Sequence, residues 1–335
     1  MAEGSLISTD PSVAAAALAA GNLAALPTET VYGLAADASN PLAIERLFRV
    51  KGRPNSHPVI VHVPSGDAVS SWARDVPGFA NELIDQFWPG PLTLILKRSA
   101  LASDAITGSQ DTVAVRCSSS SLFAQVLTDF ASHSAGPVGL AAPSANRFGR
   151  VSPTTAAHVV AELGDELIVG RDVVLNGGPT EIGIESTIVD CTSTVPRIAR
   201  LGFITESDIN EVVRTTDNAP EPAIGTPRAP GGLASHYSPT AAVQLVNADE
   251  LKTLVIAPSE SVGLIALAAI DSIAGTRRLS APSDNTEFAN QLYAALHAAD
   301  EQGINRVLVV PPAGDHGAGI ADAIRDRLTR ASAER

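Results

Sequence analysis

Short apolar runs alternate with segments of helical periodicity along the first 200 residues of this 335-residue chain, and this alternation constrains the fold most. Runs of about five residues suit buried strands, whereas longer amphipathic segments suit helices. Chains that alternate in this way form α/β domains, in which helices cover a sheet. The predicted strands of this part are Leu23–Pro27, Val59–Val63, Leu92–Lys97, Thr112–Arg116, Val138–Ala142 and Ser186–Asp190.

The segment between the first two predicted strands carries a recognisable helix start. Asn40 is a suitable N-cap, and Pro41 follows it at the first helical position. Leu42, Leu47 and Phe48 then recur at the spacing of one apolar helix face. We therefore predict a helix that begins at Pro41 and buries these three side chains.

The composition changes at residue 215 and divides the chain. Residues 215–239 read TTDNAPEPAIGTPRAPGGLASHYSP, a segment with the chemistry of a linker. We predict a first α/β domain at residues 1–214, a linker at 215–240 and a smaller α/β domain at 241–335. The smaller domain is predicted to contain strands Ala242–Val246, Leu254–Ala257, Val262–Leu267 and Val307–Val310, and helices Thr286–Ala299 and Ile320–Arg330.

The formal net charge of −13 limits the partners that this chain can bind. Stable nucleic-acid binding needs several clustered Lys and Arg side chains, which an acidic chain opposes. One eight-residue segment nevertheless contains four cations, namely Arg46, Arg49, Lys51 and Arg53. This cluster suits a small polyanion such as a nucleotide triphosphate, and it is equally typical of a solvated helix end.

The apolar runs and the cysteines exclude other classes of protein. The longest apolar stretch, Val262–Ile270, is about half the length that a bilayer demands, and the N-terminus carries no cationic leader. We therefore expect a soluble, cytoplasmic protein that does not bind membranes. Cys117 and Cys191 form no Cys-x-x-Cys pair, so no metal site is predicted.

Alternation along two predicted strands sorts polar side chains onto one face of each strand. Thr112 and Arg116 project together beside a small alanine, and His62 lies opposite the three valines of its strand. These faces predict a polar pocket wall, although each residue alone is as typical of a structural role. The sequence contains neither the Walker pattern G-x-x-x-x-G-K-S/T nor G-x-G-x-x-G. Any nucleotide therefore binds without those loops.

Eight sequence strings occur in an order that is highly specific. They are LPTETVYGL, KGRP, PVIVHV, WPGPLTLIL, DTVAVR, APSAN, SPT and IESTIVD. With these strings the chain resembles the threonylcarbamoyl-AMP synthases of the YrdC-like fold, from about Leu6 to Ile204. The linker and the added C-terminal domain look like the longer, two-domain form of these enzymes. The resemblance implies a twisted mixed-sheet α/β domain and a second, smaller Rossmann-like α/β domain.

The resemblance also implies the site residues, carried over position by position. Around threonine it places Thr30, His62, Arg116, Ser186 and the backbone of Ala142. Around ATP it places Lys51, Arg53, His57, Thr112, Ser144, Asn146, Ser152, Arg200 and Tyr237. Lys51 and Arg53 would act on the phosphates during catalysis, and His236 with Tyr237 would reach back over the site from the linker.

The activity implied by the resemblance is nucleotidyl transfer. The enzyme would form threonylcarbamoyl-AMP and pyrophosphate from L-threonine, bicarbonate or CO2, and ATP with Mg2+. The product would serve the threonylcarbamoyl modification of adenosine 37 in tRNA, with transient contact to a tRNA threonylcarbamoyl-transferase. No covalent enzyme nucleophile is needed, since aligning the reactants and stabilising the leaving pyrophosphate suffice.

Two other functions compete with this interpretation. A YrdC-like domain also occurs in hydrogenase-maturation carbamoyltransferases, but those proteins carry zinc-finger segments that this chain has no cysteine pairs to build. An RNA-binding module is the other candidate, and the net charge of −13 opposes it.

Overall fold

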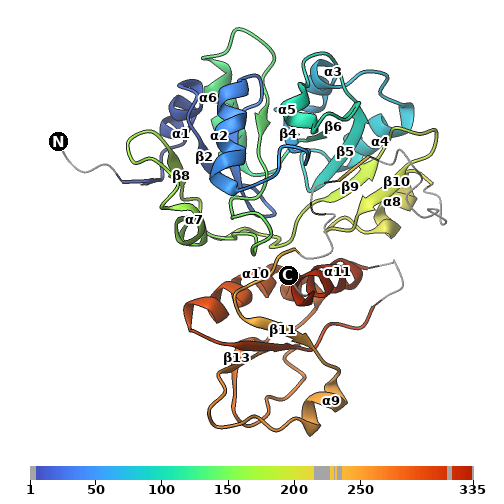
Figure 1. The fold of residues 1–335 in the computed structure, drawn as a ribbon. Coiled ribbons are helices and arrows are strands. Elements are labelled where there is room, and N and C mark those ends of the chain that lie inside the picture. Colours follow the sequence, from blue (N-terminus) through green and yellow to red (C-terminus); the bar gives the residue numbers. More distant parts are fainter. Residues whose placement is uncertain (1–4, 215–226, 230, 232–235, 315–318, 334–335) are drawn as a thin grey trace.

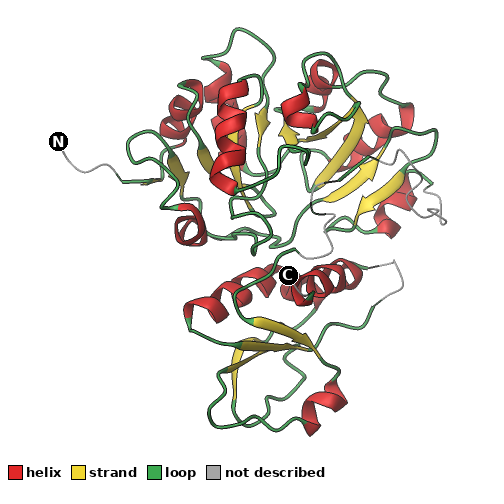
Figure 2. Cartoon of the chain, viewed as in Figure 1, coloured by secondary structure: helices red, strands yellow, loops and turns green. Residues whose placement is uncertain are grey.

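A computed structural model of the chain describes residues 5–214, 227–229, 231, 236–314 and 319–333. The chain forms a large α/β part with a ten-stranded mixed sheet, and a smaller α/β part with a four-stranded sheet. Helices lie against the faces of both sheets (Figures 1 and 2). The predicted fold class is confirmed. The predicted linker at 215–240 falls largely on residues outside the described part.

The large sheet mixes parallel and antiparallel pairs in the order β1-β8-β2-β3-β7-β4-β6-β5-β9-β10. Its strands are β1 (Ile7–Ser8), β2 (Ala24–Pro27), β3 (Tyr32–Asp37), β4 (Ile60–His62), β5 (Leu92–Lys97), β6 (Thr112–Arg116), β7 (Leu140–Ala141), β8 (Val173–Leu175), β9 (Thr187–Asp190) and β10 (Arg197–Arg200). The six strands predicted for this part are all present. Strands β1, β3, β8 and β10 were not predicted.

Helices of the large part cover the sheet. They are α1 (Pro11–Ala19), α2 (Pro41–Lys51), α3 (Val69–Trp72), α4 (Gly78–Phe87), α5 (Asp104–Thr107), α6 (Ser121–Ala131), α7 (Ala156–Leu163) and α8 (Glu206–Val212), with a 3-10 turn at Gly66–Ala68. Five of them (α1, α2, α6, α7 and α8) begin at a residue whose side chain caps the helix. The predicted start of α2 is confirmed, because the Asn40 side chain accepts from two backbone N–H groups and Pro41 follows. Leu42 was wrongly assigned to the buried face, since it is 77% exposed.

The smaller part is a parallel four-stranded sheet in the order β11-β14-β12-β13. Its elements are β11 (Ala242–Leu245), α9 (Ala248–Thr253), β12 (Val262–Ile265), β13 (Thr276–Ser280), α10 (Asn285–Glu301), β14 (Arg306–Val309) and α11 (Ile320–Ser332). The predicted strand Leu254–Ala257 is wrong, because this run pairs with no strand and Val255 is 91% exposed. The edge strand β13 was missed because its sequence, TRRLS, is polar.

Helices α10 and α11 place the smaller part against the large one (Figure 1). One apolar cluster contains Val31, Val151 and Ile184 of the large part together with Phe288 and Leu292 of α10. Polar contacts reinforce this interface. Because Val31 lines the pocket described below and Ile184 directly precedes the lining residue Glu185, the smaller part is packed directly behind that pocket. In the described part of the chain, no helix has both the length and the apolar character needed to cross a bilayer.

Candidate functional site

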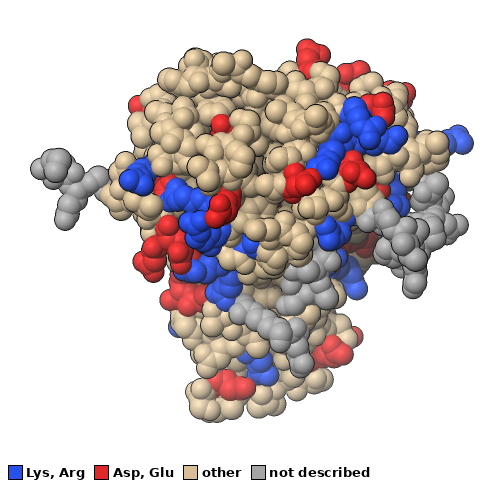
Figure 3. All heavy atoms as spheres, turned by 45° about the horizontal axis from the view of Figure 1, so that its top comes forward, with Lys and Arg blue, Asp and Glu red and all other residues tan. Residues whose placement is uncertain are grey.

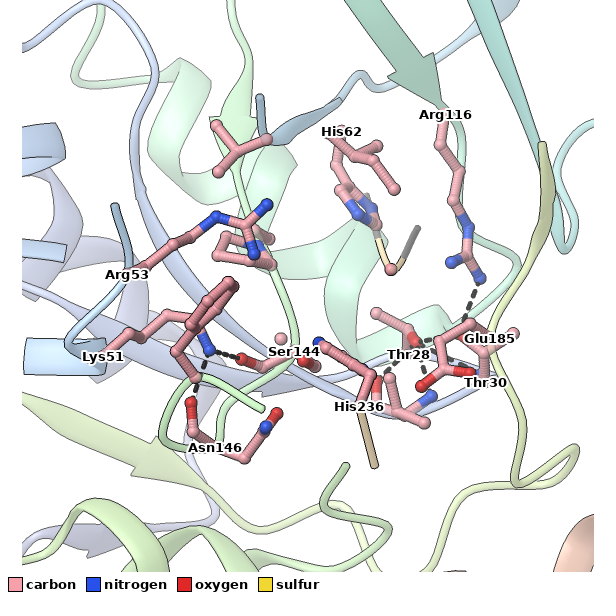
Figure 4. Close-up of a pocket in the computed structure, with 18 of the residues that line it drawn as sticks. Thr28, Thr30, Lys51, Arg53, His62, Arg116, Ser144, Asn146, Glu185 and His236 are labelled. Atoms are coloured by element: carbon pink, nitrogen blue, oxygen red, sulfur yellow. Dashed lines mark hydrogen bonds between the residues drawn. The ribbon is translucent and has the colours of Figure 1, made fainter. Parts of the chain in front are cut away.

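A pocket opens in the large part where β3, β4, β6 and the loops after α2 and β7 converge (Figure 4). Its lining residues are Thr28, Thr30, Val31, Gly33, Lys51, Arg53, Val59, Ile60, His62, Arg116, Ala142, Pro143, Ser144, Asn146, Phe148, Glu185, Arg200, Gly231, His236 and Tyr237. Four of these side chains are basic and only one is acidic. The pocket of this acidic protein is therefore strongly cationic.

Lys51 and Arg53 lie together at one end of the pocket (Figure 4). Helix α2 ends at Lys51, and Gly52 adopts a left-handed conformation with φ of 60°, which turns Arg53 toward the pocket. The Lys51 ammonium donates to the backbone carbonyls of Ser144 and Asn146. Since an ammonium has three donors, one remains for a ligand.

Arg53 is held by its backbone neighbours and by an aromatic ring. Its Nη2 donates to the Pro58 carbonyl over 2.7 Å, and its guanidinium lies 5.5 Å from the centroid of the Phe148 ring. Its Nε is buried without a hydrogen-bond partner among the described residues. The orphaned donor is suited to an anionic ligand.

The pKa values of both cations fall, and burial is the largest cause for each. Burial, followed by the charge of Arg53, lowers the pKa of Lys51 well below its usual value. Burial lowers the pKa of Arg53 to about 10. Neither residue has an ion-pair partner within 4.0 Å in the described part of the chain. A bound anion would therefore relieve a real electrostatic cost at this end.

The prediction that Arg46, Arg49, Lys51 and Arg53 form one cationic surface is wrong. Arg46 forms an ion pair with the buried Asp172. Arg49 points to solvent and pairs with Glu45 over 2.8 Å. Because residues on a helix diverge by about 100° per position, only Lys51 and the residue beyond the helix end reach the pocket.

Arg116 lies at the other end of the pocket, on β6, where it is paired in register with His62 of β4. Its Nη2 lies 2.8 Å from Oε1 of the buried Glu29 and donates to Oγ1 of Thr30 over 3.0 Å. Ser118 also donates to Glu29. The Arg116 Nε has no hydrogen-bond partner among the described residues. This end thus contains a compensated cation whose Nε donor is still available.

His62 is a neutral imidazole in this environment. Burial, followed by the charge of Arg116, lowers its pKa to about 3. Its Nδ1 is buried and makes no hydrogen bond to a described residue. A neutral ring offers one donor and one acceptor, so His62 can hydrogen-bond a ligand without adding charge. The predicted separation of His62 from the three strand valines is confirmed, since those valines lie in the core.

Glu185 is the single carboxylate in the pocket lining. Its oxygens accept from Ser152 Oγ over 2.7 Å and Tyr293 Oη over 2.9 Å, and they form an ion pair with Arg327 over 2.9 Å. Although burial raises its pKa, the charges of Arg327 and Arg200 lower it to about 2. Glu185 is therefore ionised and fully engaged, with two of its partners coming from the smaller part.

His236 and Tyr237 both line the pocket from the chain that leads into the smaller part. Burial lowers the pKa of His236 to about 3, so its ring is neutral. The Tyr237 hydroxyl is buried with no hydrogen-bond partner among the described residues. Gly231 approaches this hydroxyl so closely that a Cβ there would lie 2.6 Å from it.

Most of the residues assigned to the site from sequence lie together. The ten that line the pocket are Thr30, Lys51, Arg53, His62, Arg116, Ala142, Ser144, Asn146, Arg200 and Tyr237. Ser152 and Ser186 lie one contact away, since Ser152 donates to Glu185 and Arg200 donates to Ser186 over 3.1 Å. His57 contacts the Phe148 ring edge-on at 5.2 Å. Thr112 lies at the opposite end of β6 from Arg116 and is not among the lining residues.

Several of the lining residues were not assigned to the site from sequence, and these residues differ in how clearly the sequence marks them. Glu185 belongs to the IESTIVD string and directly precedes Ser186, so the string marked its position. Thr28 likewise belongs to LPTETVYGL. Phe148 carries no signal in the sequence, because its contact with Arg53 arises only when distant loops meet. The structure also shows no group of three or more potential metal ligands within its described residues.

Comparison with known proteins supports one family. A family model described as Telomere recombination, covering the Sua5, YciO and YrdC proteins, matches residues 16–202. A second model, described as the C-terminal domain of threonylcarbamoyl-AMP synthase, matches residues 204–333. A threonylcarbamoyl-AMP synthase of Pyrococcus abyssi is 33% identical over 96% of this chain and 94% of its own. One of Bacillus subtilis is 33% identical over 98% of this chain and 95% of its own.

A solved structure agrees with both parts of the chain. The crystal structure of the P. abyssi Sua5 protein complexed with L-threonine matches with a TM-score of 0.81 and 32% identity, covering 96% of this chain and 94% of that one. The resemblance noted in the sequence is confirmed over nearly the whole chain. The chain therefore belongs to the threonylcarbamoyl-AMP synthase family, whose members are enzymes of the nucleotidyl-transfer type.

Proposed function

We propose that this protein forms threonylcarbamoyl-AMP and pyrophosphate from L-threonine, bicarbonate or CO2, and ATP. The observation that carries the proposal is the unequal charge of the two pocket ends. One end holds Lys51 and Arg53 without carboxylate partners, and the other holds Arg116 already paired with Glu29. A polyanion and a net-neutral amino acid would satisfy these two environments together.

The triphosphate of ATP suits the end that contains Lys51 and Arg53. Phosphate oxygens would accept from the remaining Lys51 donor and from the unpartnered Arg53 Nε. Charge-assisted hydrogen bonds of this kind are about twice as strong as neutral ones. Ser144, Asn146, Arg200 and Tyr237 line the same pocket and would contact the nucleotide, with Ser152, His57 and Thr112 outside this first layer.

L-Threonine suits the end that contains Arg116. The relative from P. abyssi was crystallised with L-threonine, which favours an amino-acid site in this fold. Here the Arg116 Nε and the His62 Nδ1 are buried, unsatisfied groups that an amino acid could pair with. Thr30 and the backbone of Ala142 would complete the site, and Ser186 would act through Arg200.

The chemistry follows from this placement. The threonine amine and bicarbonate condense to a carbamate with loss of water. A carbamate oxygen then bonds to the α-phosphorus of ATP, and the bond from that phosphorus to the bridging oxygen breaks to release pyrophosphate. Lys51 and Arg53 would stabilise the charge that grows on the leaving group. His236 and Tyr237 are buried over the pocket and would shield the labile carbamate from water.

Mg2+ would enter as part of the ATP complex. Glu185 is the single carboxylate among the described lining residues, and Arg327, Tyr293 and Ser152 already occupy it. The described lining residues therefore offer the ion no open carboxylate. Mg2+ commonly keeps several waters and binds substrate phosphates, which fits this donor set. Its role would be to neutralise phosphate charge.

The product would supply the threonylcarbamoyl modification of adenosine 37 in tRNA. Contact with the tRNA threonylcarbamoyl-transferase would be transient. On the face drawn in Figure 3, basic side chains of the described residues lie beside acidic ones. Together with the net charge of −13, this pattern favours release of the product over stable tRNA binding. A cytoplasmic location would accompany this role.

The test is pyrophosphate release by the purified protein. We expect release from MgATP only when L-threonine and bicarbonate are both present, with threonylcarbamoyl-AMP detected by mass spectrometry. Release that ignores threonine would refute the proposal. Release driven by carbamoyl phosphate without threonine would instead favour a carbamoyl-adenylating enzyme.

A further inference from the structure

Helix α11 of the smaller part places Arg327 behind the pocket. This guanidinium is 1% exposed and makes three contacts with the large part or the chain that leads out of it. Its Nε donates to Glu185 over 2.9 Å, its Nη2 donates to the Leu201 carbonyl over 2.7 Å, and its Cζ lies 5.2 Å from the Tyr237 ring centroid. Arg327 does not line the pocket itself.

Tyr293 of helix α10 completes the same arrangement. Its hydroxyl donates to Glu185, and its ring stacks on Tyr237 with centroids 5.6 Å apart and planes inclined by 24°. It is also fully buried. Two side chains of the smaller part therefore hold both a pocket carboxylate and a pocket aromatic ring.

The contacts continue to the cationic end through a chain of rings. The His236 ring meets Tyr237 edge-on at 4.1 Å and Phe148 at 6.1 Å. Phe148 in turn lies under the Arg53 guanidinium. Arg327 also contacts the carbonyl of the residue after Arg200. The smaller part thus bears on Arg53, Arg200 and Tyr237, and none of these contacts involves Arg116, His62 or Thr30.

We propose that Arg327 and Tyr293 are positioning residues for the nucleotide half of the pocket. This inference rests on the proposed function for the identity of the nucleotide. Arg327 fixes the Glu185 carboxylate and the Tyr237 ring, and Tyr293 restrains the same two groups. The smaller part is thereby a component of the nucleotide site. Its side chains contact the residues that line the site and do not touch ATP themselves.

If the smaller part were only attached to the large part, the interface would be the same, but its side chains would not affect ATP binding. Arg150 and Asp300 also join the two parts, with Nη2 and Oδ2 3.0 Å apart, and neither residue lines the pocket. Asp300→Asn is therefore a matched control, because it removes an ion pair between the two parts without altering the contacts to Glu185 or Tyr237. The Asn side chain can still accept from the backbone of Thr240.

The experiment compares full-length Arg327→Lys, Tyr293→Phe and Asp300→Asn with the wild type. Melting temperatures identify a temperature range in which all four proteins are folded. Steady-state pyrophosphate release in that range then gives kcat and the KM values for ATP and threonine. We expect the KM for ATP to rise about tenfold in Arg327→Lys, because Lys cannot replace the planar fork. We expect a rise of about threefold in Tyr293→Phe, which keeps the ring and loses one hydrogen bond. The KM for threonine should change less than twofold in both.

Different outcomes separate the inference from the proposed function. Asp300→Asn should keep both KM values within twofold of the wild type, even where its melting temperature falls. Equal behaviour of all three variants, or changes in kcat alone, would overturn the positioning role. Direct binding of a non-hydrolysable ATP analogue provides a second readout. If the wild type releases no threonine-dependent pyrophosphate, weaker analogue binding by Arg327→Lys and Tyr293→Phe, but not by Asp300→Asn, would still support the inference.

Discussion

The two ends of the pocket differ in whether their buried positive charge is compensated by a carboxylate. At the Arg116 end, a buried guanidinium faces a buried carboxylate at 2.8 Å, so the protein compensates its own charge. At the Lys51 end, an ammonium and a guanidinium are buried together, and among the described residues they donate to carbonyls and lie against an aromatic ring. The charge of the first end is balanced without a ligand, whereas the buried charge of the second end is destabilising until an anion binds.

This difference would allow an acidic protein to bind the nucleotide proposed above. Buried cations without a carboxylate partner lower the stability of the free protein, and a bound polyphosphate restores that stability. A compensated ion pair instead provides fixed hydrogen-bond donors at little net charge, which suits an amino acid. Changes at the Arg116 end should therefore act mainly on stability, and changes at the Lys51 end mainly on catalysis.

The largest effect is expected from Glu29→Gln. The substitution leaves Arg116 buried without its carboxylate, and breaking a buried pair in this way costs about 3–5 kcal/mol. Urea unfolding at pH 7 measures the loss. The matched change at the other end, Arg53→Met, removes an uncompensated cation and should leave the free energy of unfolding within about 1 kcal/mol. Similar losses in both variants would contradict the comparison.

Arg53→Ala should produce the next largest effect, this time on turnover. Loss of one preorganised donor to a developing charge typically lowers the rate about 10²–10³-fold. Pyrophosphate release measures the rate, and circular dichroism checks that the fold is intact. Arg49→Ala is the control, because Arg49 leaves the same helix toward solvent. Near-wild-type turnover in Arg53→Ala would remove this residue from the mechanism.

A smaller effect should appear on acidification at the Arg116 end. The folded-state pKa of His62 is about 3, below the unfolded value near 6.5, so only the unfolded state takes up a proton as the pH falls between these values. Stability is therefore lost as the pH falls below about 6.5. His62→Gln should reduce the loss between pH 7 and 5.5 by about 1 kcal/mol, measured by denaturant titration. An unchanged slope would mean that His62 is accessible to protons when folded.

The smallest effect concerns protons at the Lys51 end. Because the pKa of Lys51 lies well below its usual value, raising the pH neutralises it earlier than an exposed lysine. Polyphosphate favours the charged form, so ATP binding should take up a proton and weaken at alkaline pH. Calorimetric titrations in buffers of different ionisation enthalpy measure this uptake, up to one proton. Lys51→Met should abolish it, and persistence of the uptake would assign it to another group.

The sequence grouped residues that the structure brings together in one pocket, but it did not predict their contacts. Lys51, Arg53 and Arg116 lie where the ordered strings place them, because strand alternation and a helix end decide which way a side chain points. The pairing of Arg116 with Glu29 was not predicted, since both residues appear as unrelated charges in the sequence. Arg46 was grouped with the pocket cations because its partner, Asp172, lies 126 positions away.

The fold was predicted where local pattern and environment agree. Strand β3 was missed because its sequence, YGLAAD, consists largely of residues with low strand propensity and is strand only through pairing with β2 and β7. The role of the smaller part was equally hidden. Arg327 resembles any other arginine on an amphipathic helix until α11 packs behind Glu185.

The most direct test of the two-ended pocket is a crystal structure of the wild-type protein with L-threonine and a non-hydrolysable ATP analogue. The account predicts the triphosphate beside Lys51 and Arg53, and the amino acid within hydrogen-bond distance of the Arg116 Nε and His62. A triphosphate bound at Arg116, or an amino acid bound between Lys51 and Arg53, would contradict it.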